Sequence, residues 1–140
     1  MNWRAHTGLA IAMLAAPVSW SLMWAVGVRP LKQPQTLWWW LQMTALLPLL
    51  EEWVFRGHLQ PMIKQRYFAG YRARHFLTPE NMITSAIFAA LHVFSHPPLW
   101  AALVFLPSLV FGWAMSRYQH LLVPVLLHGY YNAGYFFLFG

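Results

Sequence analysis

The stretch LWWWLQMTALLPLLEEWVFRGHL, residues 37–59, decides the fold class of this chain. It is apolar along most of its length, and it is longer than the roughly 20 helical residues that cross a bilayer. Yet it contains two adjacent carboxylates, Glu51 and Glu52, followed by Arg56. Ionisable groups at membrane depth are costly, so they usually face the interior of a helix bundle and mark a functional site. The stretch therefore predicts a membrane helix with a polar centre.

The composition of the chain also favours a membrane protein. Of its 140 residues, 59% are hydrophobic and 9% are charged, whereas a soluble domain carries about a quarter charged residues. A soluble domain of this size would leave most of this apolar surface in water, and disorder requires low hydrophobicity. The net charge of +6 could suggest nucleic-acid binding, but the lysines and arginines lie in short gaps between apolar runs, as they do in membrane proteins. We therefore expect no nucleic-acid partner.

The apolar stretches predict an all-α fold, a polytopic integral membrane helix bundle of about five transmembrane helices. Thr78 and Pro79 suit the start of the third helix, and Pro98 suits that of the fourth. We expect a single membrane domain over residues 1–140, with its core in about 37–139. The expected spans are residues 6–28, 37–59, 79–95, 98–117 and 121–139.

The first span has a second interpretation. Arg4 followed by the apolar residues 9–16 is also typical of a cleaved signal peptide. The apolar run continues through Trp20 and Trp24 to Val28, so we expect an uncleaved N-terminal helix in about 6–28.

The distribution of lysine and arginine predicts the orientation in the membrane. With five spans, one side of the membrane holds six of these residues and the other holds two. The six are Arg4, Lys64, Arg66, Arg72, Arg74 and Arg117, and the two are Arg29 and Lys32. Because cytoplasmic loops carry the excess of basic residues, we expect the N-terminus in the cytoplasm and the C-terminus outside. The connection 60–78 also carries aromatic side chains that suit the membrane interface.

The charged residues of the second span divide into a pair and a separate acid. Arg56 follows Glu52 by four residues, so the two lie on one helix face and can form an ion pair. Glu51 is rotated by about 100° around the helix axis, so it faces elsewhere and is the candidate for a chemical role. Pro48, one turn earlier, removes a backbone hydrogen bond and can kink the helix beside the acids. The alternative is a purely structural cluster of ion pairs between helices.

Two histidines and an asparagine are also expected at membrane depth. His92 lies deep in the third span, and His128 lies in the fifth, four residues before Asn132. That spacing places His128 and Asn132 on one helix face, where they can point to a common centre. Each histidine could instead hydrogen-bond a neighbouring helix, but with Glu51 in so apolar a chain these residues favour a site. His96 has the spacing of a metal-binding pair with His92, but it falls at a helix end, and we expect no metal there.

These residues form three motifs in a fixed order. Residues 51–56 read EExxxR, residues 88–92 read FxxxH and residues 128–132 read HxxxN, each on its own apolar segment. In this order they resemble the CPBP family, which comprises type II CAAX prenyl proteases and bacteriocin-processing enzymes and is also called the ABI family. Each motif alone is weak, whereas the ordered set of three is specific.

The resemblance implies a glutamic intramembrane endopeptidase, which hydrolyses a peptide bond near the membrane face of a membrane-tethered protein. Glu51 would be the general base that activates water, and His92 would help to hold it. His128 and Asn132 would stabilise the oxyanion. The remaining motif residues would form a supporting pair, Glu52 and Arg56.

The chemistry of hydrolysis agrees with these residue types. It needs a nucleophilic water, a base and donors aimed at the developing negative charge. A glutamate and two histidines could also bind zinc, but the resemblance favours the metal-free glutamic mechanism. We therefore expect no cofactor and no required metal.

The resemblance also suggests a substrate and a location. Short bacterial relatives serve C-terminal protein-sorting systems and cut tails made of a short motif, a membrane helix and a basic end. Such a tail, or a CAAX-like sequence, is the expected partner, in a bacterial inner (plasma) membrane. Two other functions stay open: a non-catalytic immunity or partner-binding membrane protein, and a subunit that relays protons or ions. A relay would need polar residues across the membrane, and the fourth span offers only Ser108.

Overall fold

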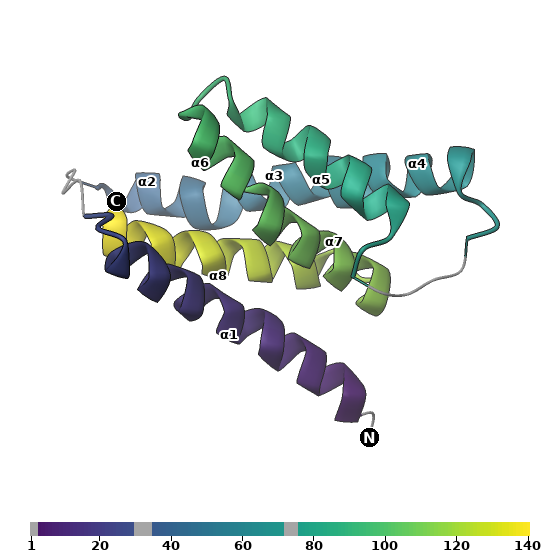
Figure 1. The fold of residues 1–140 in the computed structure, drawn as a ribbon, viewed down its shortest axis with the longest axis horizontal. Coiled ribbons are helices and arrows are strands. Elements are labelled where there is room, and N and C mark those ends of the chain that lie inside the picture. Colours follow the sequence, from purple (N-terminus) through teal and green to yellow (C-terminus); the bar gives the residue numbers. More distant parts are fainter. Residues whose placement is uncertain (1–2, 30–34, 72–75) are drawn as a thin grey trace. The chain divides into compact units, whose positions relative to one another are not determined.

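A computed structural model gives an all-α fold and describes residues 3–29, 35–71 and 76–140, with side chains from residue 7 onward (Figure 1). The all-α prediction is therefore confirmed for these residues. Four of the basic residues that predict the orientation fall outside this description: the side chain of Arg4, and Lys32, Arg72 and Arg74.

The helices follow one another in five successive segments of the described chain. The first, third and last are α1 (Trp3–Ala25), α5 (Pro79–His92) and α8 (Leu122–Phe139). The second consists of α2 (Leu37–Leu41), η1 (Gln42–Leu46), α3 (Leu47–Val54), η2 (Phe55–Leu59) and α4 (Gln60–Tyr67), of which η1 and η2 are π-helical. The fourth consists of α6 (Pro98–Leu103) and α7 (Phe105–Tyr118).

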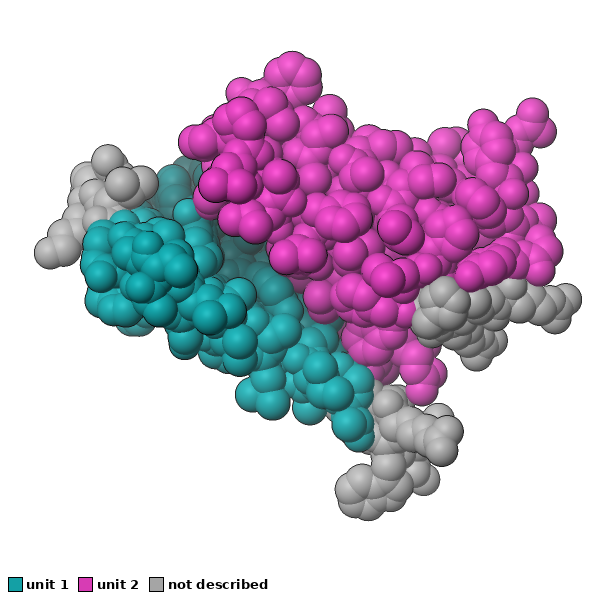
Figure 2. All heavy atoms as spheres, in the orientation of Figure 1, with its two compact units in different colours: residues 1–48, 126–140 teal, residues 49–125 magenta. Residues whose placement is uncertain are grey.

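These segments belong to two compact units, coloured separately in Figure 2. The first unit comprises Met1–Pro48 and Leu126–Gly140, and the second comprises Leu49–Val125. The division falls inside α3 and α8, so the first two motifs belong to the second unit and the third motif belongs to the first.

Each π-helical turn of the second segment precedes a proline. η1 ends two residues before Pro48, and η2 ends two residues before Pro61. Proline has no N–H, and its ring crowds the carbonyl four residues earlier. A π turn instead bonds each N–H to the carbonyl five residues back, as Leu47 does to Gln42 and Gln60 does to Phe55. The wide turns let the helix continue through Pro61 to Tyr67, where the sequence predicted a connection from residue 60.

In the first unit, α8 packs along α1 (Figure 1). The ring centroids of Trp20 and Tyr130 lie 5.5 Å apart, and the Tyr131 hydroxyl donates to the Ala12 carbonyl over 2.7 Å. A Cβ on Gly134 would overlap the Trp20 ring. Glycine at this position therefore lets the Trp20 ring approach the backbone of α8 closely.

In the second unit, α5 packs against α4, α6 and α7 (Figure 1). Its buried face meets an apolar core that includes Phe55, Phe88 and Leu109. On α7, a Cβ added to Gly112 would overlap the side chain of Asn81 on α5. The absence of a side chain at Gly112 therefore permits the close approach of these two helices.

Two described segments are long and apolar enough to cross a membrane, Thr7–Ala25 and Pro98–Tyr118. α5 has 14 residues, which reach about 21 Å at 1.5 Å per residue, against about 30 Å for the hydrocarbon core. α8 carries His128 and Asn132, and polar residues of this kind lower its mean hydropathy. The predicted bundle of five membrane-spanning helices is therefore not confirmed.

Candidate active site

The ion pair expected from the EExxxR spacing is present in the second unit. Arg56 Nε donates to Glu52 Oε2 over 3.1 Å, and both side chains are 0% exposed. A buried ion pair is stable only when further hydrogen bonds satisfy its remaining donors. Arg56 meets this requirement by donating to Gln60 Oε1 over 3.2 Å and to the Ser108 carbonyl over 2.9 Å, and also to the Ser108 hydroxyl. The pair therefore joins the second helical segment to α7.

The polar contacts around this pair extend further than the motif predicts. Gln60 Nε2 donates to a backbone carbonyl of α7 over 3.1 Å and to the Ser116 hydroxyl over 3.0 Å. Asn81 Nδ2, on α5, donates to the Leu109 carbonyl over 2.9 Å. Gln60 belongs to none of the three motifs, although its position four residues after Arg56 places it on the face of the ion pair.

Glu51 has different surroundings from its neighbour. It lines a pocket of about 250 Å³ together with His92, three apolar side chains and Ser95. The apolar side chains are Phe55, Phe88 and Leu91. All these residues belong to the second unit. The pocket therefore combines the proposed base and the histidine of the second motif.

The position of His92 determines which of its ring nitrogens carries the proton. Its Nδ1 lies 2.8 Å from the carbonyl oxygen of Phe88, one turn earlier. A carbonyl oxygen can only accept a hydrogen bond, so Nδ1 is the donor. In the neutral ring the lone pair is then on Nε2, which suits it to accept a hydrogen bond from water.

Phe88 connects the first two motifs through its ring. It is 1% exposed, and its centroid lies 4.9 Å from that of Phe55 and 4.6 Å from that of His92. The Arg56 guanidinium lies 5.9 Å from the same ring, which is within the range of a cation–π interaction. The phenylalanine of FxxxH therefore packs between the ion pair and the pocket.

The third motif lies in the first unit. His128 is buried, and Asn132 Nδ2 donates to the Met43 carbonyl in η1 over 2.9 Å. A Cβ on Gly129 would overlap the Thr44 carbonyl, so α8 approaches the π turn closely here. One N–H of the Asn132 amide is thus already hydrogen-bonded in the resting protein. The oxyanion role predicted for Asn132 did not include this bond.

A model of a known protein family matches most of the chain. It is described as type II CAAX prenyl endopeptidase, Rce1-like, and it matches residues 33–134, a range that includes all three motifs. The chain belongs to this family. Its members are intramembrane proteases, and the resemblance read from the motifs is therefore confirmed. No curated protein and no solved structure is found to match the chain.

This CAAX endopeptidase family member shows no metal centre in the part of the chain that the structure describes. No three or more side chains of His, Cys, Asp or Glu come together there in a way that could hold a metal ion. That the activity needs no metal stays a prediction.

Proposed function

We propose that this family member is a glutamic intramembrane endopeptidase in which Glu51 activates the attacking water. The observation that carries the proposal is the pocket of the second unit, where Glu51 and His92 are lining residues. A base and a hydrogen-bond acceptor beside an open cavity are what water activation requires. The neighbouring Glu52 is engaged by Arg56, so Glu51 is the acid of the motif that lines the pocket.

The roles of the other motif residues are carried over from the family resemblance. His92 holds the water through Nε2, and the ion pair of Glu52 with Arg56 holds the helix that bears Glu51. His128 and Asn132 stabilise the oxyanion of the tetrahedral intermediate. The second N–H of the Asn132 amide serves this purpose, because its first is bonded to Met43.

A setting inside the bilayer is supported by the exposed apolar side chains. On α1, Ile11, Leu14 and Leu22 are 63%, 64% and 62% exposed, and α1 contains one of the candidate membrane spans. Large contiguous apolar surfaces are rare on soluble proteins and mark contact with lipid or with another protein. We propose five membrane passages with the N-terminus in the cytoplasm of a bacterial cell.

The proposed substrate is a membrane-tethered protein cut near the membrane face. Two forms suit the family: a C-terminal sorting tail of short motif, membrane helix and basic end, and a prenylated CAAX-like terminus. Both present a peptide bond close to the lipid surface. The two forms are separated by assaying each as a synthetic peptide in vesicles.

The decisive test compares the wild type with Glu51→Gln in such vesicles. The glutamine keeps the shape and hydrogen bonding of the side chain but removes the base, so cleavage should fall by at least about 10²-fold. Equal amounts of the two proteins are compared, and the melting midpoint in detergent checks that both are folded. Equal cleavage by both proteins would reject Glu51 as the base, and cleavage of neither peptide by the wild type would favour a non-catalytic partner-binding or ion-relay protein.

Removal of metal ions provides a separate test. We expect the wild type to keep its activity after exhaustive chelation, because the glutamic mechanism needs no metal. A loss of activity that added zinc restores, and magnesium does not, would show instead that Glu51 and the histidines bind a metal.

A further inference from the structure

Among the described residues that line the pocket, Ser95 lies outside the three motifs. It lies in the connection between α5 and α6, three residues after His92. Ser95 is exposed, and it lines the pocket together with Glu51 and His92. The pocket therefore has a third polar group whose purpose the proposed water activation does not explain.

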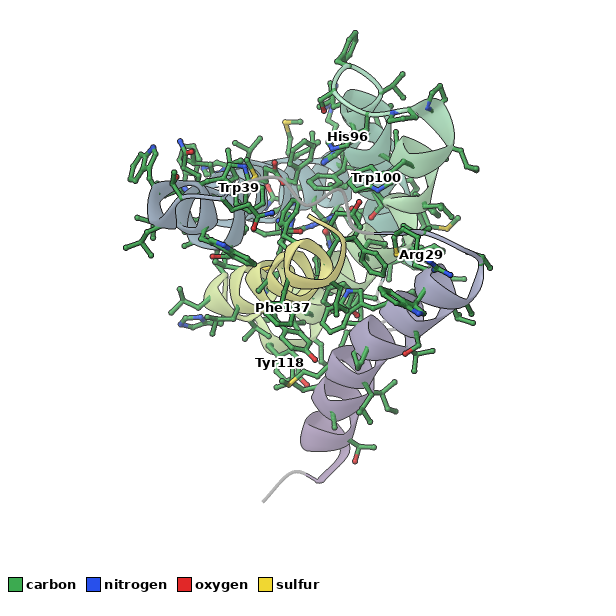
Figure 3. All side chains as sticks on the ribbon, turned by 90° about the vertical axis from the view of Figure 1, so that its left-hand side faces the viewer. Arg29, Trp39, His96, Trp100, Tyr118 and Phe137 are labelled. Carbon is green, nitrogen blue, oxygen red and sulfur yellow. The ribbon has the colours of Figure 1, made fainter. Side chains whose placement is uncertain are left out.

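The position of the Ser95 hydroxyl is fixed by the residue that follows it. Ser95 Oγ lies 2.9 Å from His96 Nδ1. The His96 ring stacks on Trp100 of α6, with centroids 4.0 Å apart and an angle of 13° between the planes (Figure 3). The backbone N–H of His96 also donates to the His92 carbonyl over 2.9 Å, and the Ser95 hydroxyl lies 3.4 Å from the same carbonyl oxygen. His96 is thus held by a ring on one side and by α5 on the other.

The chemistry of the hydroxyl leaves an acceptor available whichever proton His96 carries. A serine hydroxyl has one donor and two lone pairs. If it donates to Nδ1, both lone pairs remain. If Nδ1 donates to it, the hydroxyl proton can go to the His92 carbonyl, and one lone pair remains. Burial lowers the pKa of His96 below its ordinary value, and the neighbouring His92 lowers it further. His96 is therefore neutral near neutral pH, and either tautomer leaves Ser95 able to accept a hydrogen bond.

A substrate in this pocket brings backbone groups that need partners. A peptide bond can be attacked only after its segment has left the helical conformation, which breaks the hydrogen bonds of its N–H and C=O groups. In the bilayer each such group is costly when it finds no hydrogen-bond partner, because no water reaches it. Glu51 and His92 are engaged with the attacking water, so the exposed substrate N–H needs another acceptor.

We propose that Ser95 binds the substrate by accepting a backbone N–H next to the scissile bond, and that His96, stacked on Trp100, positions its hydroxyl. This inference rests on the proposed protease activity and adds a substrate-binding residue to it. Ser95 touches the substrate, whereas His96 acts through Ser95.

The test measures kcat and KM for Ser95→Ala, Ser95→Thr and His96→Phe with the cleavable peptide in vesicles. Loss of one hydrogen bond to the bound substrate should raise KM by about 3- to 10-fold in Ser95→Ala, with a smaller effect on kcat. Ser95→Thr keeps the hydroxyl and should restore KM. His96→Phe keeps the stacking on Trp100 but removes Nδ1, and it should raise KM in the same direction. Ser21→Ala, on α1 and outside the pocket, is the matched control and should leave KM unchanged.

Ester substrates identify the N–H that Ser95 binds. Replacing one backbone N–H at a time by an ester oxygen near the scissile bond should raise the wild-type KM at one position, by the same 3- to 10-fold or so. At that position Ser95→Ala should show no further loss, because the contact is already absent. The inference would be overturned if the ester and Ser95→Ala raised KM independently, so that their factors multiplied, at every position. An unchanged KM in Ser95→Ala would overturn it as well. If Glu51→Gln cleaves as well as the wild type, it is the proposed function that fails instead.

Discussion

Two adjacent glutamates of one helix meet different surroundings, and the difference follows from a rotation of about 100° per residue. Glu52 and Arg56 are fully buried and bonded to each other, whereas Glu51 lines the pocket. The guanidinium also binds Gln60 and Ser108. Removing the arginine would leave a buried carboxylate and several acceptors without their donor.

Arg56→Ala should therefore lower stability strongly. Breaking a buried ion pair by removing one partner typically costs about 3–5 kcal/mol. The measurement is the melting midpoint in detergent, with Glu51→Gln as the control, because its amide keeps the shape of a pocket-lining side chain. Equal melting midpoints for Arg56→Ala and the wild type would show that the network does not hold the fold.

Asn132 should contribute to stability as well as to activity. Its amide bonds the Met43 carbonyl in the resting protein, and loss of one such bond typically costs about 0.5–1.5 kcal/mol. Asn132→Ala should thus lower the melting midpoint slightly and activity more strongly. Asn132→Asp, which has no N–H to donate, should be at least as unstable as Asn132→Ala. A normal melting midpoint in both variants would restrict Asn132 to the reaction itself.

The sequence predicted some residue contacts well and missed others for a definable reason. The pair of Glu52 with Arg56 follows from spacing on one helix and is confirmed. The contacts of Asn81 with Leu109 and of Asn132 with Met43 join different helices. Such contacts depend on how helices pack, which residue spacing on a single helix does not determine.

At the scale of the helices, the approach of α7 to α5 depends on a missing side chain. Gly112 faces Asn81 so closely that a Cβ would overlap the amide, and Gln60 Oε1 would lie 2.8 Å away. Both amides are buried and hydrogen-bonded. An added methyl group would therefore disturb packing and hydrogen bonds together.

Gly112→Ala should destabilise the protein, by about 1–3 kcal/mol if it behaves as an overpacked core. Gly57→Ala is the matched control, because the nearest atom to its Cβ would be Trp53 Cδ1 at 3.8 Å. Alanine is the better helix former, so Gly57→Ala should be neutral or stabilising by up to about 1 kcal/mol. The comparison is made by melting midpoints, and a Gly112→Ala variant as stable as Gly57→Ala would contradict the close approach.

Helix starts were predicted better than helix ends. The predicted starts at residues 37, 79 and 98 agree with α2, α5 and α6, because a capping threonine or an N-terminal proline marks each one. The extension of the second segment through α4 was missed. A proline usually breaks a helix, and no local pattern showed that a π turn would accommodate Pro61.

At the scale of the whole molecule, the membrane topology is still a prediction. The motifs were sufficient to identify the family, because their residues and their order can be read from the sequence without knowing how the helices pack. The number of spans was not, because α5 has only 14 residues and because polar residues lower the hydropathy of α8. A reporter experiment on the intact chain is therefore the direct measurement.

We expect a reporter fused after Gly140 to report a C-terminus outside the cytoplasm. The six-to-two distribution of basic residues supports this orientation. An alkaline phosphatase fusion at this position should be active, and a green fluorescent protein fusion should be dark. A fluorescent fusion together with an inactive phosphatase fusion would place the C-terminus in the cytoplasm. With a cytoplasmic N-terminus, the chain would then cross the membrane an even number of times.

The π turn η2 gives the chain room for a change in its length. Each residue of an α-helix turns the chain by about 100°, and a π-helical turn accommodates one more residue than an α-helical turn. Deleting Gly57 would therefore convert η2 into an α-helical turn that completes the same rotation, and the helix after it would keep its phase. Gln60 would still face Ser116, and Lys64 its partner Glu80 on α5. The cost would fall on Pro61, whose ring crowds the carbonyl four residues earlier in an α-helix. A one-residue deletion inside the regular helix α5 would have no wide turn to absorb it and would rotate every later side chain of that helix by about 100°.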